Sequence, residues 1–146
     1  MNSMARACSM VVNLLFPRGC AGCDKPDEVL CEACRALFSQ PTAQSFDGVA
    51  MQRWFACGWY RGTVRRAVLA WKDHGDEECD RAFADAICAL AKASGVIDFV
   101  RDRHGSCHDV VVVPAPSSPA SIRRRGRKHM MPIAKHLAGF LREETG

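Results

Sequence analysis

Two closely spaced pairs of cysteines near the start of the chain constrain its fold more than any other feature. Two residues separate the cysteines within each pair and seven residues separate the pairs, which consist of Cys20, Cys23, Cys31 and Cys34. Four thiolates at this spacing can complete the tetrahedral shell of one zinc ion. Gly19 and Gly22 permit the tight backbone of the first turn. Because a closed shell leaves no open position for a substrate, we predict a compact module in which zinc is structural.

The cysteine spacing leaves iron–sulfur coordination, disulfides and thiol redox chemistry open as alternatives, because thiolate ligands alone do not choose the metal. Neither a membrane-spanning stretch nor a cleavable signal peptide is evident, so we expect a soluble cytoplasmic protein in which stable disulfides are disfavoured. The chain has nine cysteines, an odd number that cannot all pair. We expect the five without ligand spacing to be small buried apolar residues: Cys8, Cys57, Cys79, Cys88 and Cys107.

Charge is unevenly distributed along the 146 residues. The net charge is only +4, yet Arg123–Lys128 holds five basic residues, while acidic residues gather between Asp73 and Asp80. Arginine binds phosphate through a planar, bidentate and permanently charged group, so the basic segment is a candidate phosphate-binding segment. A solvated basic loop and a non-specific nucleic-acid patch remain alternatives. The composition, 48% hydrophobic and 25% charged, argues against wholesale disorder.

Apolar periodicity predicts three helices, over residues 63–75 with Thr63 as N-cap, over about 79–93, and through Met130 to Leu141. The aromatic-rich stretch 53–60 is typical of a strand, and 39–48 of a linker. A polar loop is expected over 101–108. Asp109–Val113, four valines behind an aspartate, predicts a strand buried on both faces.

The valine strand runs directly into a loop of small residues. Helices that alternate with a buried strand favour an α/β architecture with a parallel sheet, in which ligands bind beyond the carboxyl ends of strands. Here that loop is Pro114–Ser118. Its serines and free backbone N–H groups could bind anionic oxygens, although Ser117 and Ser118 could equally cap the next helical turn.

Four motifs in this order resemble the ComF family of competence-associated, phosphoribosyltransferase-like proteins. The first motif is Leu15–Cys23 together with Cys31–Cys34, and the second is Tyr60–Arg65 leading to Trp71-Lys72. The third is Val112–Ser118 and the fourth is Arg123–Arg127. The likeness covers about residues 14–142. The resemblance implies a zinc ribbon over 14–38, a linker over 39–52, and the N-terminal part of a type I phosphoribosyltransferase-like domain over 53–146.

The resemblance also implies an enzyme that binds phosphoribosyl pyrophosphate and transfers its phosphoribosyl group to a nitrogenous acceptor, with magnesium bridging the pyrophosphate oxygens. The residues it points to for pyrophosphate binding are Pro114, Ala115, Pro116, Ser117, Ser118, Arg123, Arg125 and Lys128. The family's mobile loop, expected to close over the substrate, falls on Arg125–Lys128, where Arg127 and Lys128 replace the usual aromatic and amide residues.

One part of the family pattern is missing from these 146 residues. We find no acidic pair followed by a T-T-G-x-T-like loop, the segment that holds the ribose 5-phosphate and supports magnesium. We therefore expect a truncated protein or a fragment, with an incomplete sheet, unassigned catalytic residues and no transferase activity of its own. The alternative is a non-enzymatic zinc protein that binds single-stranded DNA or a competence partner through its basic segment.

Overall fold

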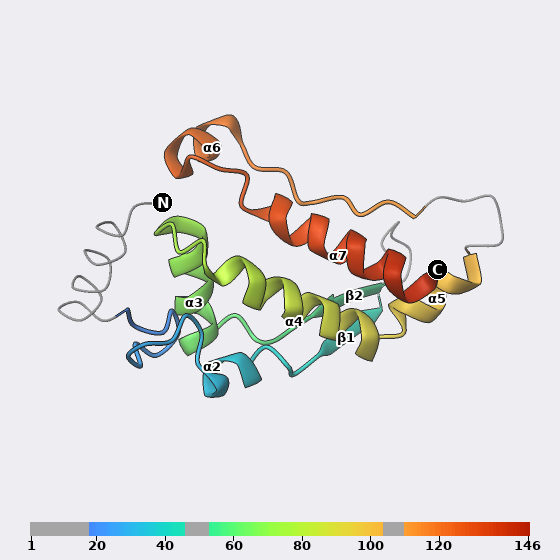
Figure 1. Cartoon of the computed structure of the whole chain (residues 1–146), viewed down its shortest axis with the longest axis horizontal. Helices are drawn as coiled ribbons and strands as arrows, with labels where there is room; N and C mark the ends of the chain where they lie inside the picture. The colour runs from blue at the N-terminus through green and yellow to red at the C-terminus, as the bar shows by residue number, and fades with distance from the viewer. Residues whose placement is uncertain (1–17, 46–52, 104–109) are drawn as a thin grey trace, which may run out of the picture.

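The computed structural model describes residues 18–45, 53–103 and 110–146. Helices dominate these residues, and one short hairpin lies among them (Figure 1). The elements are α2 (Glu32–Ala36), β1 (Thr42–Ser45), β2 (Arg53–Ala56), α3 (Gly62–Asp73), α4 (Cys79–Ala93), α5 (Val96–Arg103), α6 (Pro119–Arg125) and α7 (Met130–Thr145).

Three long helices form where the apolar periodicity predicts them. α4 spans the predicted residues, α7 begins at the predicted Met130, and α3 ends just before Gly75. The N-cap prediction for Thr63 is wrong, because α3 begins at Gly62 and Arg61 holds the cap position. Among the described helices, none combines the length and the apolar character that crossing a membrane requires.

The sheet of the described residues has two strands. β1 pairs with β2 in antiparallel register, from Thr42 opposite Ala56 to Ser45 opposite Arg53. The predicted strand over 53–60 is therefore shorter, since the chain leaves the ladder after Ala56 and exposes Trp59 and Tyr60. β1 itself lies in the segment expected to be a linker.

The prediction of a buried valine strand is wrong for its described part, Val110–Val113. These residues belong to no strand, and Val111 and Val113 are 74% and 78% exposed. A strand buried on both faces needs neighbouring strands to pair its N–H and C=O groups, and none of the described segments provides one. The chain instead runs as an extended segment toward α6 (Figure 1), and no parallel sheet exists within the described ranges.

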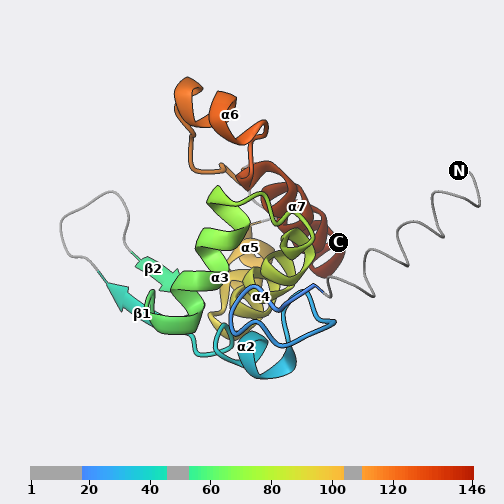
Figure 2. The same ribbon diagram turned by 90° about the vertical axis from the view of Figure 1, so that its left-hand side faces the viewer.

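The core joins the cysteine-rich segment to the helices. Phe83 of α4 packs edge-to-face against both Phe38 and Trp71, with ring centroids 5.1 Å apart in each pair. Leu30, which is 1% exposed, and Ile133 of α7 belong to the same buried cluster. α7 lies along α4 and also contacts α5 (Figures 1 and 2). The cysteine pairs are therefore anchored in the same core as α3, α4 and α7.

Candidate functional site

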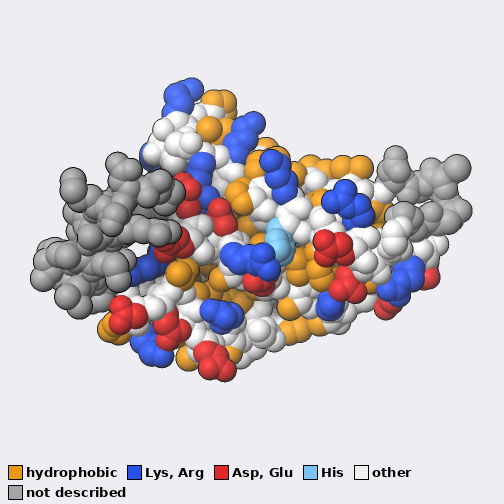
Figure 3. Space-filling model, viewed as in Figure 1, with side chains coloured by type: hydrophobic (Ala, Val, Ile, Leu, Met, Phe, Trp, Pro, Cys, Tyr) orange, Lys and Arg blue, Asp and Glu red, His pale blue; other side chains and the backbone are white. Residues whose placement is uncertain are grey.

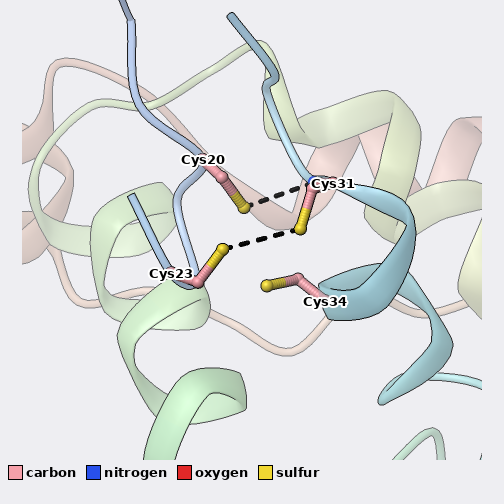
Figure 4. A group of neighbouring side chains, drawn as sticks. All are labelled: Cys20, Cys23, Cys31 and Cys34. Atoms are coloured by element: carbon pink, nitrogen blue, oxygen red, sulfur yellow. Dashed lines mark hydrogen bonds between the residues drawn. The ribbon is translucent and has the colours of Figure 1, made fainter. Parts of the chain in front are cut away.

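The four paired cysteines converge on one point (Figure 4). Their sulfur atoms all lie within 4.8 Å of one another, and the Cys23 and Cys31 sulfurs are 3.5 Å apart. Zn–S bonds of about 2.3 Å in a tetrahedron place sulfurs about 3.8 Å apart, so the observed cluster matches the size of such a shell. The predicted cysteine cluster is confirmed as a group that could hold one metal ion.

Local backbone structure presents each pair. Cys20 and Cys23 lie on a tight turn, in which the Cys20 carbonyl accepts a hydrogen bond from Asp24 N–H at 2.8 Å and Cys20 N–H donates to the Lys25 carbonyl at 2.8 Å. Cys31 occupies the N-cap position of α2, and Cys34 lies in the first turn of that helix. A turn and a helix start therefore supply two sulfurs each, which explains why the short spacer suffices.

Gly22 is required for space within this cluster. A Cβ atom at this position would lie 2.7 Å from Cγ2 of Thr63 in α3 and 2.9 Å from the Cys34 sulfur. Both separations are shorter than ordinary van der Waals contact. The glycine thus lets the first cysteine turn approach both the second pair and the start of α3.

Backbone donors and burial act on the thiols in opposite directions. Burial by itself raises the pKa of Cys20, but N–H donors from Cys31, Cys23 and Gly22 lower it to about 6. The Cys31 N–H is 3.2 Å from the Cys20 sulfur. Burial, followed by hydrogen bonds to the neighbouring thiols, raises the pKa of Cys34. A bound cation would favour the thiolate form of all the ligands, because it offsets their mutual repulsion.

The candidate pyrophosphate-binding residues gather at two adjoining pockets. A pocket of about 390 Å³, here called the anion pocket, is lined by Ala115, Pro116, Ser117, Ser118 and Arg125, together with Lys72, Ser121 and His129. Pro114 and Lys128 line a neighbouring pocket of about 250 Å³. Arg123, in α6, lines neither of these two. The structure therefore brings part of the predicted set together with residues of α3 and α7.

Ser118 has a structural role in the described chain. It is the N-cap of α6, and its hydroxyl accepts a hydrogen bond from Ser121 N–H at 3.2 Å. The capping interpretation of this serine therefore holds. Ser117 is half-buried and lines both pockets.

The first half of the basic segment is helical, and three of its arginines, Arg124, Arg125 and Arg127, form ion pairs. Arg123, Arg124 and Arg125 belong to α6, which ends where Gly126 adopts the left-handed conformation at φ +74°. Arg125 lies 2.9 Å from the Asp73 carboxylate, and its side chain is only 11% exposed. Arg127 forms a two-pronged contact with Asp80, at 2.7 and 2.9 Å.

The partners of this segment are Asp73 at the end of α3, Glu77 between the helices and Asp80 in the first turn of α4. We call residues 73–80 the acidic loop. Acidic and basic side chains lie beside one another on the face shown in Figure 3. Burial raises the pKa of Asp80, but hydrogen bonds from Arg127 and Trp71 outweigh it and lower that pKa. Three arginines of the basic segment thus pair in the fold with three carboxylates of the acidic loop.

His129 is a buried residue of the anion pocket to which sequence analysis assigned no role. It is 6% exposed, and its ring packs edge-to-face against Trp71 with centroids 5.0 Å apart. Burial, and then the nearby charges of Arg125, Lys72 and Arg127, lower its pKa. Its position before a helix, without a partner nearby in the sequence, offers no signal for a site.

Comparisons of the chain with protein families, with curated proteins and with solved structures find no match.

Proposed function

We propose that this chain is a zinc-stabilised domain that binds the pyrophosphate group of a phosphorylated ligand, such as phosphoribosyl pyrophosphate, in the anion pocket. The observation that carries the proposal is the convergence of Lys72, Arg125, His129 and three serines on one open pocket. The loop that lines it is the segment that resembles the pyrophosphate loop of ComF-like proteins.

The polar groups of the pocket suit a phosphate-bearing ligand. Lys72 is half-buried and forms no ion pair with any residue in the described ranges, so its charge is available. Arg125 contacts Asp73 through Nε and one terminal nitrogen, yet a guanidinium has five N–H donors and can serve a second anion. A volume of about 390 Å³ lies within the range of small-molecule sites.

Zinc would be held by Cys20, Cys23, Cys31 and Cys34, and in a closed shell of thiolates it supplies a cross-link rather than catalysis. The cysteine turn contacts the N-terminal end of α3 through Gly22 and Thr63. Lys72 lies near the other end of the same helix. The metal module would therefore fix α3, which in turn presents Lys72 to the pocket.

Binding without transfer is the expected behaviour of these 146 residues. They carry no counterpart of the acidic pair and ribose-phosphate loop that support magnesium in the resembling family. Asp73, the carboxylate nearest in sequence to Lys72, is engaged by Arg125 and Arg124. We therefore assign no magnesium ligands and expect no pyrophosphate release with nucleobase or amine acceptors.

The test is a calorimetric titration of the purified, zinc-loaded chain with pyrophosphate and with phosphoribosyl pyrophosphate. Lys72→Met should weaken binding by about tenfold or more, the loss expected for one charge-assisted contact. Lys135→Met is the matched control. Lys135 lies on α7 at a different pocket, so its replacement should leave the affinity for both ligands unchanged.

The result that would overturn the proposal is the absence of saturable binding to either ligand. Salt-sensitive binding of a single-stranded oligonucleotide, without any response to pyrophosphate, would instead favour the DNA-binding alternative.

A further inference from the structure

His129 is buried at the edge of the anion pocket without a complete set of partners. It precedes α7 at the N-cap position and is 6% exposed. Its Nδ1 atom is buried and has no hydrogen-bond partner among the described residues. A buried nitrogen left unpaired is unfavourable, and in folded proteins such a group commonly has a ligand or water as its partner. The imidazole therefore lines the pocket and keeps one buried nitrogen unpaired among the described residues.

The charges around this imidazole come from every element packed against it. α3 contributes Lys72 and Asp73, α6 contributes Arg125, the turn after α6 contributes Arg127, and α4 contributes Asp80. The two carboxylates are each engaged by an arginine, Asp73 by Arg125 at 2.9 Å and Asp80 by Arg127 at 2.7 Å. Of these cations, Lys72 is the one without a paired carboxylate in the described part of the chain. The ligand-free pocket therefore carries net positive charge beside His129.

This arrangement disfavours a charged imidazole in the ligand-free chain. Burial lowers the pKa of His129, and the surrounding cations lower it further. An anion in the pocket would reverse the second effect, because a nearby negative charge favours the imidazolium form. Protonation also turns the ring from one N–H donor into two, which increases its capacity to bind oxygen.

We infer that His129 takes up a proton from solvent when an anion enters the pocket, so that anion affinity rises as pH falls. The inference rests on the proposed function, because it requires that the pocket bind an anion. The only covalent change is the new N–H bond on the imidazole, and the proton comes from the buffer. The chain would thus hold an anion of constant charge more tightly under mildly acidic conditions.

The test uses sulfate as the probe, because its charge stays constant over the pH range of interest, whereas pyrophosphate itself titrates. Affinity of the zinc-loaded chain for sulfate is measured from about pH 8 to about pH 6. We expect it to rise by about tenfold over this range, below the limit of about tenfold per pH unit that one fully coupled proton sets. His129→Gln should bind as the unmodified chain does at the higher pH and lose the increase.

His136→Gln is the matched control for this experiment. His136 lies on the same helix, 3.4 Å from the Asp85 carboxylate, and lines a different pocket. Its replacement should leave the pH dependence of sulfate binding unchanged. Zinc content and thermal unfolding of each variant verify that the fold persists.

A second measurement needs no folded variant at position 129. Proton NMR of the histidine ring resonances of the unmodified chain should show one titration midpoint move upward when sulfate saturates the pocket, and His136→Gln should leave that resonance in place. An absence of any such movement would overturn the inference.

The outcomes separate the two proposals. Sulfate binding with the same pH dependence in the unmodified chain and in His129→Gln would overturn the role of His129 while the proposed function stands. Absence of saturable binding to both sulfate and pyrophosphate at every pH would overturn both.

Discussion

The cysteine module, residues 18–38, and the C-terminal arm, residues 110–128, attach to the same helices by different forces. The module contributes buried side chains to the core, among them Leu30, Cys34 and Phe38. The arm exposes Val110, Val111 and Val113 and makes ion pairs through Arg125 and Arg127.

The acidic loop serves both regions, because Arg18 of the module also pairs with Asp76 and Glu78. Buried apolar side chains, together with a bound metal ion, can hold a segment in place even where its charged side chains have no opposite charge beside them. The attachment of a segment held by ion pairs weakens when either charged partner of a pair is removed. The comparison therefore predicts strong sensitivity to cysteine replacement and smaller, pH-dependent sensitivity in the arm.

The largest effect is expected from Cys34→Ser. Loss of one thiolate opens the metal shell and leaves the remaining buried sulfurs without their cation. The free energy of unfolding should fall by about 3 kcal/mol or more, with loss of stoichiometric zinc measured by elemental analysis. Cys57→Ser is the control. Because Cys57 lies outside the cluster, this variant should retain zinc. Full metal content in Cys34→Ser would contradict a four-thiolate site.

Asp80→Asn should have the second largest effect. It removes the carboxylate that holds Arg127 at two positions and accepts the Trp71 N–H at 2.5 Å. We expect a loss of about 2 kcal/mol in chemical denaturation, less than for a fully buried pair because Arg127 also lies 3.5 Å from Glu77. Arg124→Met, which removes a side chain that is 71% exposed, should cost less than about 0.5 kcal/mol. Equal losses for the two variants would refute the distinction between buried and exposed pairs.

The same pair predicts a pH dependence in acid. The pKa of Asp80 is lowered in the fold, so its contribution is complete above the ordinary aspartate value of about 3.9 and is lost as pH falls through the folded value. The stability difference between the unmodified chain and Asp80→Asn should therefore shrink below about pH 4. A difference that stays constant into that range would show that Asp80 is not stabilised as a carboxylate.

The smallest effect is expected from Val111→Lys combined with Val113→Lys. Both side chains are mostly exposed, so the free energy of unfolding should change by less than about 0.5 kcal/mol. If these valines were in a buried strand, the same change would unfold the chain. Val64→Lys, at a position 8% exposed in α3, provides the contrasting result of severe destabilisation.

Sequence patterns were most informative where the structure depends on near neighbours. The helices α3, α4 and α7 follow apolar residues spaced three and four apart, and the cysteine cluster follows from ligand spacing. The valine run failed as a predictor because strand formation depends on partners that its own residues do not specify. Part of the expected linker became β1 for the converse reason, since β2 was available to pair with it.

By itself, the sequence determined the positions of the long helices and the identity of the four clustered sulfurs, because both depend on contacts between residues close along the chain. Only the tertiary structure decided which charges meet. Arg127 and Asp80 are 47 residues apart in sequence, and their contact depends on how α4 packs beside α7. The burial of His129 against Trp71 arises in the same way. Long-range packing sets desolvation and neighbouring charge, and these two quantities give the anion pocket its chemistry.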